Sequence, residues 1–324
     1  MQREINYAYA VGRIRVAENA MLDKNKYERM IDQPSVDDCL RVLYEAGYQE
    51  AREYEDILKN ESIKTYHYLS QISPEPDVFR MFQYKNDTHN IKVLLKDEFS
   101  NKESDHLLLE NGSYEVASLK VMIRERYFKD LPQLLKEAIL QVIEQYSKTK
   151  DPQIIDILLD QAYFRLFQSL STTTRNAYLI NLARIQIDMT NISAFIRIKS
   201  KMEDLELLSK VLIDGGTIDK KEYSRYFQEQ IDVFKEKIAV TAYAEIMEQS
   251  FDNGFNITKL EKACDNFLMK YLRKSKNKAF GIEPLIGYMV GKETEIRNVR
   301  IILVGKINHI DNDIIRERLR TSYV

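Results

Sequence analysis

The chain has 324 residues, 44% of them hydrophobic, which is enough for a large core or for several domains. Its 48 basic and 50 acidic residues leave a formal charge of -2, so no excess of Lys and Arg exists to neutralise nucleic-acid phosphates. The cysteines Cys39 and Cys264 are too few for a disulfide framework and too far apart for a metal cluster, which favours a reducing cytoplasm.

The N-terminal residues MQREINYAYAVGRIRV carry charges at Arg3, Glu4, Arg13 and Arg15. They do not form the continuous apolar core of a secretory signal. Apolar runs elsewhere are short, for example residues 301–304, whereas a helix that spans a bilayer needs about 20 apolar residues. We expect a soluble protein that can still sit against a membrane complex.

Three capping boxes predict helix starts at Ser35–Asp38, Asp219–Glu222 and Thr258–Glu261. Asp37 and Asp38 also resemble the start of the D-D-x-x-D magnesium motif of all-α prenyl-transferring enzymes, but Arg41 stands at the fifth position. The helix cap therefore explains this pair better than the alternative, an all-α metal-dependent enzyme.

Long helices are predicted in the middle of the chain, because no Gly or Pro lies between residues 153 and 214 or between 217 and 253. Apolar residues there recur every three or four positions, at Ile155, Leu158, Leu159, Ala162, Leu166 and Leu170. Such a stripe is typical of a helix that packs on one side. Since sustained alternation of period two is absent, we predict an all-α fold.

A repeat of about one hundred residues organises the chain. Its first marker is an acid, two residues, an asparagine and a β-branched aliphatic. The three acid–asparagine pairs are Asp87 with Asn90, Asp188 with Asn191, and Glu295 with Asn298. The asparagines lie 101 and 107 residues apart, and an apolar helical stretch follows each one.

The second marker is a glycine followed by a hydroxyl residue, at Gly112-Ser113 and again 104 residues later at Gly216-Thr217. The glycine is predicted to end one helix and the hydroxyl to start the next. Both markers predict three homologous helical domains, 1–112, 113–216 and 217–324.

The third copy lies in GYMVGKETEIRNVRIILVGK, residues 287–306, whose two Gly-Lys pairs suggest a phosphate-binding loop. Such a loop needs four residues between its glycines and a hydroxyl after the lysine. Only three residues separate Gly287 from Gly291, and Glu293, which follows Lys292, would repel phosphate. We therefore predict no nucleotide site here.

Two sets of residues are candidates for contact with a partner. The acid–asparagine pairs either satisfy backbone groups in each domain, which we favour, or contact a partner. The second set forms a basic stretch of five residues, Lys270, Arg273, Lys274, Lys276 and Lys278. A solvated loop is the favoured interpretation of that stretch, and docking of an acidic partner or of lipid headgroups is the alternative.

No catalytic, metal-binding or cofactor-binding residue is predicted. The four histidines, His67, His89, His106 and His309, have neither the i, i+4 spacing nor the H-E-x-x-H pattern of a zinc site. G-x-S-x-G is absent too, and no Cys/His nucleophile setting is recognisable.

Several local strings resemble one family over essentially the whole chain. They are Tyr7-Ala-Tyr-Ala10 with Arg13-Ile-Arg15; Phe82-Gln-Tyr-Lys-Asn-Asp87 running into Asn90-Ile-Lys92; Glu283-Pro-Leu-Ile-Gly-Tyr288 running into Glu293 and Ile296-Arg297-Asn298; and Ile314-Ile-Arg-Glu-Arg-Leu-Arg320 before Tyr323-Val324. The sequence resembles the central-axis connector of rotary V-type and A-type ATPases, called the C subunit in prokaryotes and the d subunit in eukaryotes.

This resemblance implies a funnel of three similar helical domains around a pseudo-threefold axis, present once per complex. One side would sit on the cytoplasmic face of the membrane rotor ring, made of c/K-type proteolipids, and the cavity would take the tip of the central shaft, made of D/F-type subunits. The protein would transmit torque without hydrolysing ATP and without a cofactor. The alternative function is a general all-helical adaptor or scaffold that binds partner helices.

Overall fold

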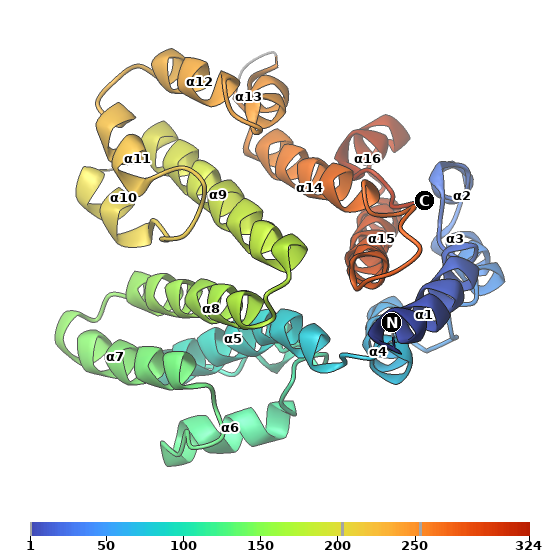
Figure 1. Cartoon of the computed structure of the whole chain (residues 1–324), viewed down its shortest axis with the longest axis horizontal. Coiled ribbons are helices and arrows are strands. Elements are labelled where there is room, and N and C mark those ends of the chain that lie inside the picture. The colour runs from blue at the N-terminus through green and yellow to red at the C-terminus, as the bar shows by residue number, and fades with distance from the viewer. Residues whose placement is uncertain (1, 202–203, 253–254) are drawn as a thin grey trace. The chain divides into compact units, whose positions relative to one another are not determined.

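The computed structural model describes residues 2–201, 204–252 and 255–324 (Figure 1). Every regular element in these ranges is a helix, which confirms the predicted all-α class. The helices are α1 (Gln2–Glu18), α2 (Lys24–Ile31), α3 (Val36–Glu45), α4 (Tyr54–Ile72), α5 (Asp77–Ser100), the 3-10 helix η1 (Asp105–Leu107), α6 (Val116–Glu125), α7 (Gln133–Thr149), α8 (Gln153–Thr173), α9 (Ala177–Ser200), α10 (Leu205–Val211), α11 (Lys220–Tyr226), α12 (Ile231–Ala239), α13 (Ala244–Phe251), α14 (Ile257–Arg273), α15 (Glu283–Ile307) and α16 (Asn312–Arg318). Within the described ranges, no helix combines the length and apolarity that crossing a membrane requires.

The chain divides into two compact units. Unit 1 combines Met1–Phe79 with Ile238–Val324, and unit 2 is Arg80–Lys237. Unit 1 therefore contains segments from both ends of the sequence. Compactness and internal homology are different properties, so the domains 1–112, 113–216 and 217–324 stay a prediction of homology.

Two of the three predicted N-caps are confirmed. The Ser35 hydroxyl accepts the Asp38 N–H at 3.2 Å, and the Asp219 carboxylate accepts the Lys221 N–H at 2.8 Å. The cap predicted at Thr258 is wrong, because Asn256 caps α14 and accepts the Thr258 N–H at 2.8 Å. Asn is a stronger N-cap than Thr, which explains the earlier start.

The predicted apolar stripe of α8 lies in the core of unit 2. Ile155, Leu159, Ala162 and Leu166 are buried against residues of α5, α6 and α7, and Leu158 and Leu170 pack at its edge. The core of unit 1 is built in the same way, since residues of α15 and α16 are buried against residues of α2, α3 and α4.

Residues 287–306 lie inside one continuous helix, α15, so neither Gly-Lys pair belongs to a loop. The glycines serve close packing instead. A Cβ at Gly291 would lie 2.6 Å from Tyr323 Cβ, and one at Gly305 would lie 2.6 Å from Ile315 Cδ1. The C-terminal segment and α16 therefore lie directly on the backbone of α15.

Replacing Gly291 by Ala tests this packing. Although Ala favours a helix by about 1 kcal/mol over Gly, overpacking against Tyr323 costs about 1–3 kcal/mol, so we expect a net loss of stability in urea unfolding. Gly12→Ala is the matched control, because nothing lies within 4 Å of a Cβ built at Gly12 in α1. If Gly291→Ala is as stable as Gly12→Ala, Tyr323 does not pack closely enough on α15 to exclude a methyl group.

Candidate functional site

The three repeat asparagines make the same contact. Each is buried on a long helix, and its side-chain amide binds both the N–H and the C=O of one later residue. The pairs are Asn90 with Leu109, Asn191 with Ile213 and Asn298 with Arg320, with bonds of 2.8 or 2.9 Å. The amide thus replaces the backbone partners that these non-helical residues lack.

The first two repeat acids bind the second sequence marker. Asp87 accepts the N–H of Ser113 at 3.0 Å, the Ser113 hydroxyl at 2.6 Å and the Tyr114 N–H at 3.2 Å. Asp188 does the same with the N–H and hydroxyl of Thr217 and, at 3.1 Å, with the Ile218 N–H. The two markers therefore give one period because they are the two halves of one contact.

The predicted role of Ser113 and Thr217 as helix starts is wrong. Helices α6 and α11 begin later, after Glu115 and Asp219, because both hydroxyls bond to the repeat acids instead.

The glycines before them do not end helices either. A Cβ at Gly112 would lie 2.2 Å from Asp87 Oδ1, and one at Gly216 would lie 2.1 Å from Asp188 Oδ1. Only glycine leaves the carboxylate room to reach the following backbone.

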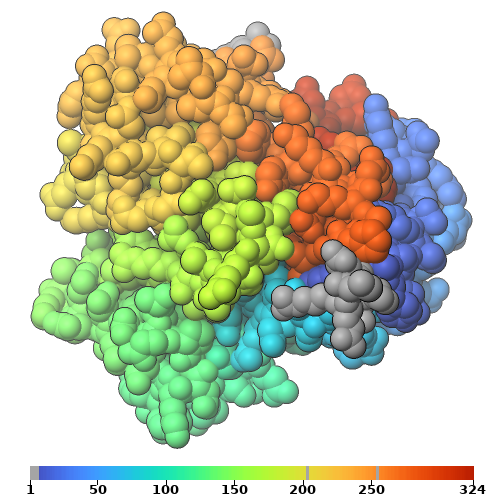
Figure 2. Space-filling view, in the orientation of Figure 1, coloured from blue at the N-terminus to red at the C-terminus, as the bar shows by residue number. Residues whose placement is uncertain are grey.

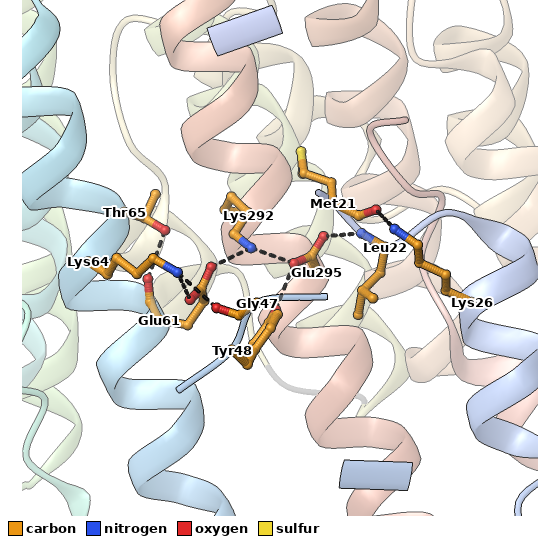
Figure 3. Close-up of polar contacts among 10 residues, drawn as sticks. All are labelled: Met21, Leu22, Lys26, Gly47, Tyr48, Glu61, Lys64, Thr65, Lys292 and Glu295. Carbon is orange, nitrogen blue, oxygen red and sulfur yellow. Dashed lines mark hydrogen bonds and ion pairs between the residues drawn. The ribbon is translucent and has the colours of Figure 1, made fainter. Parts of the chain in front are cut away.

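The third acid, Glu295, finds its backbone partner near the other end of the sequence. The Leu22 N–H donates to Glu295 Oε2 at 2.6 Å (Figure 3). Leu22 stands just before α2, as Tyr114 stands before α6 and Ile218 before α11. Five positions after each of these residues comes a buried one, at Tyr27, Leu119 and Tyr223 respectively.

The same unit of packing therefore occurs three times. A long helix that carries the acid and the asparagine holds the start of a short helix and packs against it: α5 with α6, α9 with α11, and α15 with α2. We call this arrangement the repeat contact. In unit 1 it joins two segments that lie far apart in the sequence.

Glu295 belongs to a buried ionic cluster in unit 1 (Figure 3). Lys292, which is 4% exposed, places its Nζ 2.6 Å from Glu295 Oε1 and 2.6 Å from Glu61 Oε1. The Nζ also lies 4.8 Å from the centroid of the Tyr48 ring, and the Tyr48 hydroxyl donates to Glu295 at 2.7 Å. Lys64, which is exposed, places its Nζ 3.1 Å from Glu61 Oε2. These contacts fix α4, α15, Tyr48 and Leu22 to one another.

The electrostatics of the cluster favour a charged lysine. Burial by itself lowers the pKa of Lys292, but the carboxylates of Glu295 and Glu61 more than offset burial, so its pKa is raised. Burial raises the pKa of Tyr48 well above its ordinary value, and Glu295 adds to the effect. Burial likewise raises the pKa of Asp87, against the opposing hydrogen bonds from Ser113 and Tyr114.

Sequence reasoning missed Lys292, Glu61 and Tyr48 as parts of this cluster. The spacing of Lys292 and Glu295, three positions apart on one helix, was a usable signal. Glu61 and Tyr48 carry no such signal, because they reach Glu295 and Lys292 only through the tertiary fold.

The five basic residues 270–278 lie in the last turn of α14 and the turn that follows it. Lys270 pairs with Glu245 at 2.6 Å, and Lys278 pairs with Glu283 at 2.8 Å. The Lys276 Nζ lies 5.6 Å from the centroid of the Tyr323 ring. Arg273 and Lys274 are exposed. Contact of this stretch with a partner stays a prediction.

Asp38 is used at the start of α3, where its carboxylate accepts the Ser35 hydroxyl at 2.6 Å and pairs with Arg41 at 2.9 Å. Across the described ranges, no group of three or more His, Cys, Asp or Glu is placed to hold a metal ion.

The family model described as ATP synthase (C/AC39) subunit matches residues 10–318. The C subunit of the V-type sodium ATPase of Enterococcus hirae is 26% identical over 96% of this chain and 97% of its own length. The C subunit of the A-type ATP synthase of Methanocaldococcus jannaschii is 26% identical over 97% of this chain and 86% of its own. The C subunit of the A-type ATP synthase of Methanosarcina acetivorans is 22% identical over 97% of this chain and 92% of its own length.

The repeat contact predicts a large loss of stability for Asn191→Ala. The buried N–H and C=O of Ile213 lose their partner in this variant, which lowers the free energy of unfolding by about 1–3 kcal/mol for each group. Urea unfolding measures this loss. Asn308→Ala is the matched control, because Asn308 is exposed and makes one bond, to the Val304 carbonyl, so a change of at most about 0.5 kcal/mol is expected. Equal stabilities of the two variants would show that the contact adds nothing.

The ionic cluster predicts that Lys292→Met loses about 3–5 kcal/mol, because two buried carboxylates lose their shared cation. Lys64→Met removes only the exposed partner of Glu61 and is expected to lose at most about 1 kcal/mol.

The raised pKa of Lys292 adds stability that is present below the unfolded-state pKa of about 10.4 and is lost as the pH rises through the folded-state value.

The stability difference between wild type and Lys292→Met should therefore stay constant up to about pH 10 and shrink at higher pH, as measured by urea unfolding of both proteins from about pH 8 to about pH 11. A difference that grows with pH would contradict the assigned sign.

Proposed function

Because the chain belongs to the ATP synthase (C/AC39) subunit family, whose members are non-catalytic subunits of rotary V-type and A-type ATPases, we propose that it connects the central shaft to the membrane rotor ring. In this role it transmits torque that couples ATP hydrolysis or synthesis to ion transport. Its partners are the D/F-type shaft subunits and the c/K-type ring, and it lies on the cytoplasmic face of the membrane. The family match over residues 10–318 carries this proposal.

The contacts within the two units support a stiff connector. A part that passes torque must not deform, and close-packed helices resist deformation. The repeat contacts add buried hydrogen bonds between the acid–asparagine helices and the segments that they hold. The cluster around Lys292 adds a charged contact between α4 and α15.

The repeat contacts also support three homologous helical domains, 1–112, 113–216 and 217–324. Each contact pairs the last long helix of one copy with the first short helix of a copy: α5 with α6, α9 with α11, and α15 with α2. Helix α1 precedes the first such short helix and has no counterpart in the other two copies.

Calorimetric titration of this protein with the purified central-shaft subunits of the same organism tests the proposal at low and at high salt. We expect saturable one-to-one binding, and a weaker affinity at high salt if exposed cations such as Arg273 and Lys274 contribute. No binding by the folded protein at either salt, together with its absence from ATPase complexes isolated from native membranes, would contradict the connector function.

A further inference from the structure

Between Tyr7 and Val16, helix α1 is mostly apolar on both of its sides. Its inner side is buried, through Tyr7, Ala10, Val11 and Ile14. Its outer side exposes Ala8, Tyr9, Gly12, Arg13 and Val16. Tyr9 is 61% exposed and Val16 is 71% exposed, and Arg13 is the one charged residue among these five. A helix that is apolar all round is normally covered on all sides, so this outer face fits a helix that a partner covers.

Gly12 in the middle of this face is not explained by packing within the chain. Nothing lies within 4 Å of a Cβ built there, unlike at Gly291 and Gly305. Glycine in a helix interior costs about 1 kcal/mol relative to Ala. A glycine allows another backbone to approach closely, and an approaching partner helix would use that space.

Arg13 and Arg15 point to different surroundings. The Arg13 guanidinium lies 6.0 Å from the ring centroid of Tyr9 and 5.7 Å from that of Tyr68, at the exposed surface. Arg15 pairs with Glu18 at 2.7 Å and donates to the backbone carbonyls of Lys276 and Lys278. Arg15 therefore holds the basic stretch against α1.

The outer face of α1 and the basic stretch consequently adjoin. Figure 2 shows the dark-blue surface of α1 beside the orange surface of the α14 end. The nearby acids Glu18, which is buried, Glu245 and Glu283 already pair with Arg15, Lys270 and Lys278 respectively. The exposed charges that remain on the outer face and the basic stretch, on Arg13, Arg273 and Lys274, are all positive.

We propose that the outer face of α1 and the basic stretch form one docking surface for a helix of a partner subunit. The apolar face of that partner helix meets Tyr9, Gly12 and Val16. Its carboxylates meet Arg13, Arg273 and Lys274. The positive charge of the surface selects an acidic helix. The inference rests on the proposed function, because it places the partner in the rotary ATPase. Arg15 is a positioning residue.

The test adds purified full-length protein to the ATPase complex prepared from cells that lack this chain, and measures the dissociation constant. Gly12→Leu should weaken binding at least about tenfold while the melting temperature of the free protein stays unchanged or rises, since Leu favours a helix. The double variant Arg273→Glu with Lys274→Glu should weaken binding and reduce its salt dependence. Gln141→Leu, on the exposed side of α7, is the control and should bind as wild type does.

The outcomes separate the inference from the function. If wild type binds the complex and Gly12→Leu binds it equally well, the docking surface is overturned and the connector function is unaffected. Failure of wild type to bind overturns the connector function, and the inference with it. The Arg273→Glu, Lys274→Glu variant is also tested for binding to phosphatidylglycerol vesicles. If it loses vesicle binding but still binds the complex as wild type does, the occupant is a lipid surface and the partner helix is overturned.

Discussion

The fold depends on one contact that is made three times, in which an acid and an asparagine on a long helix satisfy the backbone of a segment outside that helix. Buried N–H and C=O groups without partners are costly, so a non-helical segment can lie against the core only where side chains replace the hydrogen-bond partners that a helix would supply. The asparagines bind both groups of Leu109, Ile213 and Arg320, and they thereby fix where each segment lies. Helix packing then follows from these fixed points.

The sequence predicted the period of this contact but only part of its geometry. Asp87 with Asn90 and Gly112 with Ser113 were visible as markers, because the contact needs those residue types at each occurrence. That the two markers bind each other was not visible, since the bond spans 26 residues. The all-α class and the stripe of α8 were predictable, because local periodicity determines both. Leu22 in the third contact and Glu61 in the ionic cluster were not, because their partners lie more than two hundred residues away.

The third contact also explains why unit 1 contains segments from both ends of the sequence. Glu295 on α15 holds Leu22 before α2, and the cores of both segments merge around Ile302 and Leu43. Lys292 and Glu61 add an ionic contact at the same place, where a buried charge is tolerated only when it is fully paired. A connector that carries load benefits from such a joint, since its terminal segments are then held by the core.

The central claim is that this chain couples the catalytic part of a rotary ATPase to its ion-carrying ring. The most direct measurement compares ATP hydrolysis and ion uptake in vesicles that contain the complex rebuilt with and without this protein. If the chain is this connector, ion uptake requires it, while the catalytic part hydrolyses ATP without it. Equal ion uptake per ATP in both preparations would contradict the account.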